Sequence, residues 1–499
     1  MQNTSYTKKQ FALGFIKMVV SVVAFANVAF CVNAVFQPKY TQETTTDTPS
    51  TTIIRGFYDL DKNAIDAVFI GSSVCYYGIN PLVIWHETGI RSHSFGSPNQ
   101  RLDTSVFFME EMFKTQKPKV VMVDAGRFVS GASISEARFR KAMDEIPLSL
   151  EKLQYINDRI QADENLLHYA FAGIRYHDRW PDLKAHDFTI PLIADRHDFY
   201  HGYAPIFTTS SLRMNAYEDA VEDAEISDEN VAYMKRMKEI CAKNGAELVF
   251  IKVPSSTWRK AQSELVAELA QREGLRYYDF TPIYDREIGL DLKTDFADSV
   301  HLNYTGAEKF SKYLAQILRN DLMPEPRSQL KRGEEAQWEA DSLHYERAKQ
   351  AHTLTQVQDF STYLDSLNDE NYALFIAVRN DASRRLTPAM DEGLKRLGLK
   401  ESLIDKYRWA YIAVTDGGKL LYEAHEKRPL EYAFNYQGMH VYLKSVGYDD
   451  GNAVSIIING EDYTKELNRR GIHFVVYDKL LGSIVDHAYY HTYERVLYR

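Results

Sequence analysis

The sequence predicts an α/β protein whose main domain is a three-layer, doubly wound parallel sheet, with an N-terminal transmembrane helix and a C-terminal β-rich α+β domain. Three observations predict this architecture. An uncharged apolar run lies near the N-terminus, short apolar runs then alternate with amphipathic helical segments, and the last third of the chain changes to strand-like alternation. A chain of 499 residues that is 45% hydrophobic is long enough to bury more than one core.

The N-terminal apolar run predicts a membrane anchor in residues 1–40. Residues 18–36 carry no charge and are long enough to cross a bilayer, and Lys8 and Lys9 precede them. Basic residues before the span favour a cytoplasmic N-terminus, with everything after Phe36 outside the cytoplasm. A cleaved signal peptide is the alternative, because "VNA" at 32–34 loosely resembles a cleavage site. The apolar run exceeds the usual length of a signal core, which favours an uncleaved anchor.

The anchor leads through a Thr-rich segment, residues 41–55, which we expect to be a polar stalk. In residues 56–320, the apolar runs "DAVFIG", "KVVMVDAG", "AELVFIKVP" and "LRYYDFT" alternate with helical segments such as 227–245. Continuous apolar strands joined through helices predict a parallel sheet covered on both faces, with its ligands at the carboxyl ends of the strands. Residues 130–225 interrupt this rhythm with many His, Arg and aromatic residues, and we expect an insertion over the site.

The C-terminal part of the chain changes character. Residues 321–352 are charged with few apolar residues, which is typical of a linker. Residues 353–499 contain "YALFIAVRND", "NAVSIIING" and a hairpin pattern around "DKLLGS". These patterns predict a separate β-rich module.

Charge, cysteine content and histidine spacing disfavour three features: nucleic-acid binding, a disulfide framework and a metal site. The 59 basic and 69 acidic residues give a net charge of −10, which disfavours a nucleic-acid binder. One of three cysteines, Cys31, lies in the apolar run, so no disulfide framework is expected, although Cys75 and Cys241 are still available to pair. The histidines of the insertion lack ligand spacing, and we expect neither a metal nor a cofactor.

The stretch "VFIGSSVCYYG" places Ser73 directly after a predicted strand and before a predicted helix. A serine at such a junction projects its hydroxyl from the carboxyl edge of the sheet, as in the nucleophile elbow of α/β-hydrolases, although "GSSVC" lacks the second glycine of that motif. A helix cap or turn residue is the alternative.

A nucleophilic serine requires a base and a group that orients the base. Asp298 and His301 are three residues apart in "DSVH", in a loop before a helix expected to begin at Thr305 with the capping-box pattern "TGAE". A surface turn is the alternative for this pair alone. Because Ser73 and the pair all fall at strand-to-helix junctions of one predicted sheet, they predict a Ser-His-Asp triad.

These motifs resemble those of the SGNH/GDSL hydrolase superfamily: "FIGSS" matches its first block, and "DSVH" with "LNYTGAEKFS" matches its last. The resemblance implies that Ser73 is the nucleophile, His301 the base and Asp298 its partner. It also implies that the backbone amides of Ser73 and Gly96 belong to the oxyanion hole.

The family has four such sequence blocks, and the third of them departs from the family pattern in this chain. Where the family has Gly-x-Asn, this chain has "DAGRF" at 124–128, so the usual Asn donor is missing. Asn99 and Arg127 are the candidates to replace it, and the loss of one donor costs about 100-fold or more in rate.

The anchor and the insertion with "RYHDRW" narrow the resemblance to extracytoplasmic SGNH-like proteins that work beside membrane-bound O-acyltransferases, such as those of teichoic acid D-alanylation and exopolysaccharide acetylation. The resemblance implies that Ser73 accepts an acyl group and passes it to a cell-surface glycan, with a membrane-bound O-acyltransferase as a partner. The candidate substrate-binding residues are Arg127, Arg175, His177, Arg179 and Lys252. Salt bridges or solvated side chains are the alternative for these residues.

The C-terminal module, about 370–492, is similar to the interleukin-like, PANDER-type domain through "LFIAVRNDASRRLTPAMDEGLKRLGL" and "RGIHFVVYDKLLGSIVDHAYYHT". Some relatives are attached to glycan-modifying enzymes, so the resemblance implies carbohydrate binding. Trp409, Tyr422 and Tyr436 are candidates to stack on sugar rings, and packing in the core is the alternative for each.

Two hypotheses follow for the whole chain. The first is a membrane-anchored esterase or O-acyltransferase, which the complete set of Ser73, His301 and Asp298 favours. The second is a non-catalytic glycan-binding or assembly protein that works with a membrane-bound O-acyltransferase, which the missing Asn of the third block favours.

Overall fold

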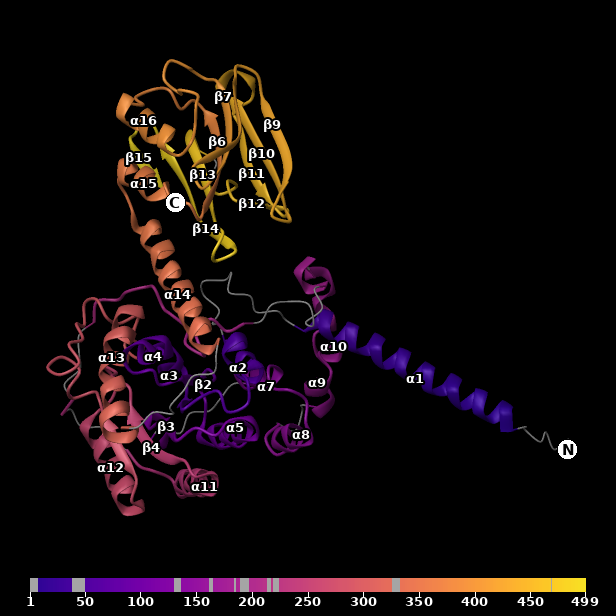
Figure 1. Ribbon diagram of the computed structural model, residues 1–499, viewed down its shortest axis with the longest axis vertical. Helices are drawn as coiled ribbons and strands as arrows, with labels where there is room; N and C mark the ends of the chain where they lie inside the picture. The colour runs from indigo at the N-terminus through magenta and orange to yellow at the C-terminus, as the bar shows by residue number, and fades with distance from the viewer. Residues whose placement is uncertain are drawn as a thin grey trace. The chain divides into compact units, whose positions relative to one another are not determined.

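The computed structural model describes residues 8–37, 50–129, 136–160, 165–183, 185–188, 197–212, 217–218, 224–324, 333–467 and 469–499. The chain divides into two compact units, Met1–Trp338 and Glu339–Arg499. Figure 1 labels elements of both units where there is room, and each unit is described here by itself.

Unit 1 is built on a five-stranded parallel sheet with the order β2-β1-β3-β4-β5. The mixed α/β class with a parallel sheet is therefore confirmed. The order reverses between β1 and β3, and ligands of such sheets bind at the carboxyl ends of the strands where the order reverses. The strands are β1 (Ala67–Gly71), β2 (Ser92–Gly96), β3 (Val120–Asp124), β4 (Glu247–Lys252) and β5 (Arg276–Asp279).

Helices cover both faces of this sheet. Val68 and Ile70 of β1 pack in one core with apolar residues of α5, α11 and α12, whereas Phe69 packs in a second core with residues of α4 and α13. Burial on both faces explains why β1, β3 and β4 are continuous apolar runs. These helices and the short helix after β1 are α3 (Ser73–Gly78), α4 (Pro81–Thr88), α5 (Leu102–Thr115), α11 (Asp228–Asn244), α12 (Lys260–Glu273) and α13 (Tyr304–Ile317), and the chain continues from α13 into η3 (Leu318–Leu322).

The N-terminal helix α1 (Lys8–Phe36) contains 26 residues, Phe11–Phe36, with a mean hydropathy of 2.2. It is long and apolar enough to cross a membrane. The predicted polar stalk is partly wrong: residues 50–55 belong to α2 (Ser50–Asp59), in which Ile53, Ile54 and Phe57 are buried. These apolar residues form one helical face within a Thr-rich composition. Residues 41–49 of the predicted stalk lie outside the described residues.

The predicted insertion contains short helices in its described parts: α7 (Glu136–Asp144), α8 (Leu150–Asn157), α9 (Leu166–Ala170), α10 (Ala172–Arg175), η1 (His177–Asp182) and η2 (Ala185–Phe188). The turn after β3 forms α6 (Gly126–Val129). Within the segment predicted to be a linker, residues 334–352 belong to the helix α14 (Glu334–Gln356).

Unit 2 is β-rich, as the sequence predicts. Its ten-stranded sheet has the path β12-β11-β10-β6-β13-β14-β15, with β7 and β8 added beside β6, and β9 beside β10. Only the short β6–β10 pairing is parallel among the described strand pairs of this unit. The predicted hairpin is β13 with β14, and Gly482 in its turn has a φ of 64°.

The strands of unit 2 are β6 (Tyr372–Asn380), β7 (Ala410–Asp416), β8 (Lys419–Glu426), β9 (Leu430–Tyr436), β10 (Met439–Gly447), β11 (Val454–Ile458), β12 (Glu461–Asp462), β13 (Gly471–Asp478), β14 (Ser483–His491) and β15 (Val496–Tyr498). Its further helices are α15 (Phe360–Leu367), α16 (Pro388–Arg396) and the short η4 (Tyr448–Asp450). Buried residues of α15 and α16 pack on one side of β6, and those of β9, β10 and β11 on the other.

Candidate active site

Ser73 is the first residue of α3, two positions beyond the end of β1. The turn is tight: a Cβ on Gly71 would lie 2.5 Å from Cys75 Sγ, so only glycine fits there. Ser72 is buried at the helix N-cap without a side-chain capping hydrogen bond, whereas Ser73 is half-buried. The fold therefore places the Ser73 hydroxyl beside the point where the strand order reverses.

Three side chains meet there in a continuous hydrogen-bonded chain. His301 Nε2 lies 2.7 Å from Ser73 Oγ, and His301 Nδ1 lies 2.8 Å from Asp298 Oδ2. The carboxylate accepts from Nδ1–H, which leaves Nε2 as the acceptor for the serine hydroxyl proton. Ser73 and His301 are 228 positions apart in the chain, so tertiary structure and not a local turn brings them together.

The carboxylate of Asp298 is held ionised. Burial alone raises its pKa, but the hydrogen bond from His301 and the backbone N–H groups of Val300 and His301 outweigh burial and lower the pKa to about 2. These two backbone groups donate to Oδ1 at 2.7 and 2.9 Å. Asp298 is thus a negative charge of fixed orientation behind the imidazole, although its side chain is 54% exposed.

The loop that carries Asp298 and His301 is fastened to α13. The helix begins at Tyr304, and its N-cap is Asn303, whose Oδ1 accepts from the Gly306 N–H at 3.1 Å. The predicted start at Thr305 is therefore wrong by one residue: the Thr305 hydroxyl instead donates to Asn303 Oδ1 at 2.7 Å. Asn303 Nδ2 also donates to the carbonyl of Thr294 at 2.7 Å, which ties both ends of the loop together.

The candidate oxyanion residues lie on the neighbouring strand and in the loop after it. Gly96 pairs in register with Gly71, and a Cβ on Gly96 would lie 2.3 Å from the Gly71 carbonyl oxygen. Asn99 has a φ of 52°, and its Oδ1 accepts from Arg127 Nη2 at 2.8 Å. Because the carbonyl end of the planar amide faces Arg127, the Nδ2 donor faces away from it.

The predicted substrate-binding residues separate into two groups. Lys252 is buried at the end of β4, and its Nζ lies 3.4 Å from Asp124 Oδ2 at the end of the adjacent β3. Arg127 follows β3. Burial lowers the pKa of its guanidinium, and the nearby Asp124 carboxylate offsets only part of this effect. Both side chains therefore belong to the carboxyl edge of the sheet.

The other three residues have different partners. Arg175 pairs with Glu136 at 3.5 Å, Arg179 pairs with Asp187 at 2.9 Å, and His177 Nδ1 lies 2.9 Å from the Ile174 carbonyl oxygen. They belong to α10 and η1, and none of these contacts is with the triad. Substrate binding by these residues stays a prediction.

Cys75, two residues after Ser73, is not in the environment of a reactive thiol. Cys75 is fully buried, and burial followed by the charge of Asp124 raises the pKa of its thiol well above the usual range. A thiol that stays protonated is unreactive. Cys75 and Cys241 are both free, so the pairing that the sequence left open does not form.

Sequence reasoning missed one neighbour of the triad. The Tyr77 and His301 rings are nearly perpendicular, with centroids 5.2 Å apart, and burial raises the pKa of Tyr77 to about 12. Tyr77 follows Ser73 by four residues in α3, and side chains at this spacing share one helix face. That spacing is the signal that identifies Tyr77 once the helix is known.

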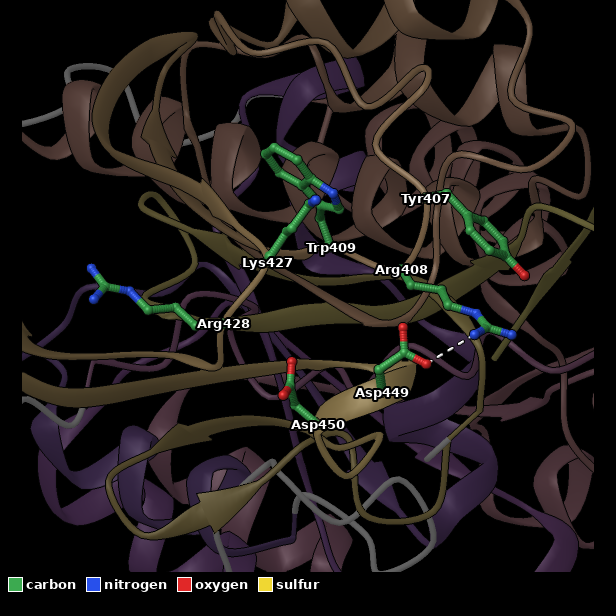
Figure 2. Close-up of a pocket in the computed structure, with 7 residues that line it drawn as sticks. All are labelled: Tyr407, Arg408, Trp409, Lys427, Arg428, Asp449 and Asp450. Carbon is green, nitrogen blue, oxygen red and sulfur yellow. Dashed lines mark hydrogen bonds and ion pairs between the residues drawn. The ribbon is translucent and has the colours of Figure 1, made fainter.

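Unit 2 contains a separate cavity of about 490 Å³. Figure 2 shows Trp409 beside Lys427, and Arg408 paired with Asp449 across the cavity at 2.8 Å. Of the three aromatic residues predicted to stack on sugars, only Trp409 lines this cavity. Tyr436 is buried and donates to Asp416, and Tyr422 stacks on Tyr432 with ring centroids 3.7 Å apart.

No family model matches the chain, and no curated protein matches it. One similar solved structure is that of a Bacteroides fragilis protein described as a "putative acylhydrolase". The two chains are 10% identical with a TM-score of 0.26, and the match covers 56% of this chain and 100% of the other. A similarity at this level assigns neither a family nor an activity, so the chemistry of the site depends on the geometry of Ser73, His301 and Asp298.

Proposed function

We propose that this protein is a membrane-anchored SGNH-type esterase or O-acyltransferase. Ser73 is the nucleophile, His301 is the general base, and Asp298 orients the imidazole and stabilises its protonated form. One observation carries the proposal: His301 joins Ser73 Oγ at 2.7 Å and Asp298 Oδ2 at 2.8 Å through its two ring nitrogens. This is the constellation that activates a serine hydroxyl in unrelated hydrolases.

The reaction has two balanced halves. Ser73 Oγ attacks the carbonyl carbon of an ester while its proton moves to His301 Nε2, and the Asp298 carboxylate stabilises the imidazolium. Nε2 then protonates the leaving alkoxide, and the acyl group remains on Ser73. In the second half, water or a sugar hydroxyl attacks the acyl carbonyl carbon and gives its proton to His301 Nε2. The bond from the acyl group to Ser73 Oγ breaks, and Nε2 returns the proton to Oγ.

The developing oxyanion requires donors. The backbone N–H groups of Ser73 and Gly96 and the Asn99 amide supply them in this proposal, and the Arg127–Asn99 hydrogen bond supports Asn99 as the replacement for the missing third-block Asn. Arg127 thereby acts as a positioning residue.

The substrate proposed is an acyl group, in the simplest case acetyl, on a cell-surface polysaccharide, with the domain outside the cytoplasm and a membrane-bound O-acyltransferase as partner. The sequence resemblance and the apolar helix α1 support this choice. The alternative, a non-catalytic glycan-binding or assembly protein, is supported by the third block without Asn and by the Trp409 cavity of unit 2.

A fluorophosphonate probe separates these alternatives without knowledge of the substrate. An activated Ser73 Oγ forms a bond to phosphorus while fluoride leaves and the hydroxyl proton passes to His301. We expect full-length protein in detergent to be labelled at Ser73 and Ser73→Ala to stay unlabelled. We expect His301→Ala to be labelled at about one thousandth of the wild-type rate or more slowly still.

The matched control is Ser72→Ala, because Ser72 is the adjacent buried serine and its side chain makes no capping bond. Labelling of Ser72→Ala at the wild-type rate, followed by acetylation of Ser73 from an activated acetyl ester, supports the enzyme. Folded wild-type protein that reacts with neither reagent overturns it in favour of the binding protein.

A further inference from the structure

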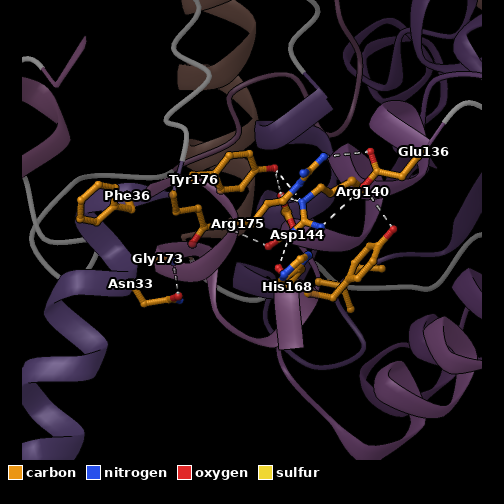
Figure 3. Close-up of polar contacts among 12 residues, drawn as sticks. Asn33, Phe36, Glu136, Arg140, Asp144, His168, Gly173, Arg175 and Tyr176 are labelled. Carbon is orange, nitrogen blue, oxygen red and sulfur yellow. Dashed lines mark hydrogen bonds and ion pairs between the residues drawn. The ribbon is translucent and has the colours of Figure 1, made fainter. Parts of the chain in front are cut away.

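The last turn of α1 is packed against the insertion of unit 1. Asn33 Oδ1 accepts from the Gly173 N–H of α10 at 3.2 Å, and Arg179 of η1 donates to the Phe36 carbonyl at 2.7 Å. The Phe36 ring also stacks on Trp180, with centroids 6.4 Å apart. Figure 3 shows Asn33 and Phe36 beside Gly173. The segment α10–η1 therefore lies at the level of the C-terminal end of the apolar helix.

This segment and the helix α9 before it display apolar side chains to solvent. Leu167, Phe171, Ile174 and Trp180 are 43–70% exposed, and we call these four residues the apolar patch. Leu148, Leu150 and Phe188 of the same region are also exposed. Across the described residues of unit 1 outside α1, every exposed large hydrophobic side chain falls between positions 148 and 188. Such a concentration marks an interaction surface and not ordinary scatter.

A buried polar framework holds the patch in place. The Arg140 guanidinium lies 4.4 Å from the centre of the Tyr169 ring, donates to Tyr176 Oη at 2.9 Å and forms ion pairs with Glu136 and Asp144 (Figure 3). These contacts join α7, α9 and the residue that follows α10. The polar groups point inward to Arg140, while apolar side chains face out, which reverses the usual arrangement of a soluble surface.

The contacts of Asn33 and Phe36 with α10 and η1 determine the depth of the patch relative to α1. Residues 33–36 are the end of the 26-residue apolar stretch, so in a membrane they lie where the hydrocarbon core meets the headgroups. We propose that the apolar patch is inserted into the interfacial layer of the bilayer that α1 crosses, so that the occupant of this surface is phospholipid. Trp180 beside Phe36 suits that layer, because tryptophan prefers the membrane–water interface.

Two arginines of the segment suit this occupant, beside the exposed carboxylates of Asp178 and Asp182. Arg175 and Arg179 lie in the same segment, with side chains 38% and 24% exposed. Arginines at this level are able to approach lipid phosphates while the apolar side chains enter the acyl region. The inference requires that α1 is retained as a membrane span, and it is independent of the chemistry of Ser73.

Quenching of tryptophan fluorescence by lipids tests the inference. Full-length protein is reconstituted in phosphatidylcholine vesicles with or without bromine on the acyl chains. Trp85, Trp258 and Trp338 are buried, whereas Trp180 is 70% exposed. We expect brominated lipid to quench the wild-type emission and most of this quenching to disappear in Trp180→Phe. The matched control Trp409→Phe, which removes a tryptophan of unit 2, retains it.

Equal quenching of wild type and Trp180→Phe overturns the inference, because Trp180 then lies in water or under protein. A photoactivatable phospholipid gives a second readout: peptides of residues 166–182 become labelled, whereas Leu343, which is 60% exposed in α14, does not. If the patch is unlabelled but shielded from iodide, a protein covers it and the inference is wrong. Fluorophosphonate labelling of Trp180→Phe reports separately on Ser73, so the two proposals fail independently.

Discussion

At the scale of single residues, Asp298 accepts three hydrogen bonds, two from backbone N–H groups and one from His301 Nδ1. Its role is tested by Asp298→Asn, which keeps the size of the side chain but removes the charge that stabilises the imidazolium. We expect kcat for an activated acetyl ester to fall by about 100- to 10,000-fold. The control Asp285→Asn removes an exposed carboxylate elsewhere in unit 1 and leaves kcat unchanged. An unchanged rate in Asp298→Asn contradicts the assigned role.

Asn99 and Arg127 are expected to act as a pair. If the Asn99 amide contacts the oxyanion, Asn99→Ala lowers kcat by about 100-fold with little change in KM. Arg127→Ala also lowers kcat, because it acts through Asn99, and it adds little in the Asn99→Ala background. Steady-state kinetics of the two single variants and the double variant check this. A rise in KM alone for Arg127→Ala indicates instead that Arg127 binds substrate, as expected from the sequence analysis.

At the scale of elements, the close approach of β1 and β2 decides whether the oxyanion residues keep their positions. Gly96→Ala places a methyl group 2.3 Å from the Gly71 carbonyl, and neither backbone is free to move in a buried sheet. We expect a loss of about 1–3 kcal/mol of stability and slower labelling of Ser73. Gly173→Ala is the control, since its methyl group meets its nearest neighbour at 3.4 Å. Thermal unfolding that is equal for both variants contradicts the predicted clash.

The elements also show which patterns are readable in a sequence. The runs of β1, β3 and β4 were predictable because both faces of these strands are buried, which requires continuous apolar residues. The edge strand β5 is only partly buried, and its run was recognised from the aromatic residues in "LRYYDFT". The strand β2, "SHSFG", was missed because polar residues occupy buried positions in it, two of them beside groups elsewhere in the fold: Ser94 donates to the Ile79 carbonyl, and His93 lies 3.5 Å from Asp198. These partners are distant in sequence, so no local pattern reports them.

The same limit applies to the candidate site. The three-residue spacing of Asp298 and His301 and the strand-end position of Ser73 identified the triad residues, because each is a local property. The partners of the insertion arginines were not predictable, since a composition rich in Arg and His does not show that Arg179 pairs with Asp187. Helix α2 was hidden in the same way, because a Thr-rich composition concealed the apolar face of Ile53, Ile54 and Phe57.

At the scale of the whole molecule, a two-unit chain predicts separable functions. In unit 2, Lys406 and Lys427 lie 4.4 and 5.7 Å from the centre of the Trp409 ring, and Lys427 also lines the cavity (Figure 2). We expect Trp409→Ala to weaken binding of an acidic polysaccharide by about 3- to 10-fold and to leave fluorophosphonate labelling unchanged. Tyr493→Ala, an exposed aromatic outside this cavity, is the control in a sedimentation assay. Equal binding by both variants excludes stacking on Trp409.

Separate units also imply separate responses to pH. In unit 2, His473 of β13 is buried, its Nε2–H donates to the Arg469 carbonyl at 2.7 Å, and burial lowers its pKa to about 4. Between pH 6.5 and 4 the unfolded chain therefore takes up a proton that the folded unit refuses. Stability conferred by the neutral ring is present above pH 6.5 and declines as the pH falls towards 4, by up to about 3 kcal/mol.

His473→Gln keeps a donor for the Arg469 carbonyl but has no titrating ring, so we expect a flatter pH dependence. The exposed His440 of β10 provides the matched control, His440→Gln, which follows the wild type. Urea unfolding of the full-length protein from pH 7 to 4.5, read by hydrogen exchange in peptides of β6 and β13, separates unit 2 from unit 1. If the stability of unit 2 depends on pH as steeply in His473→Gln as in the wild type, other groups cause its acid sensitivity. One such group is the half-buried His425, whose pKa burial also lowers to about 4.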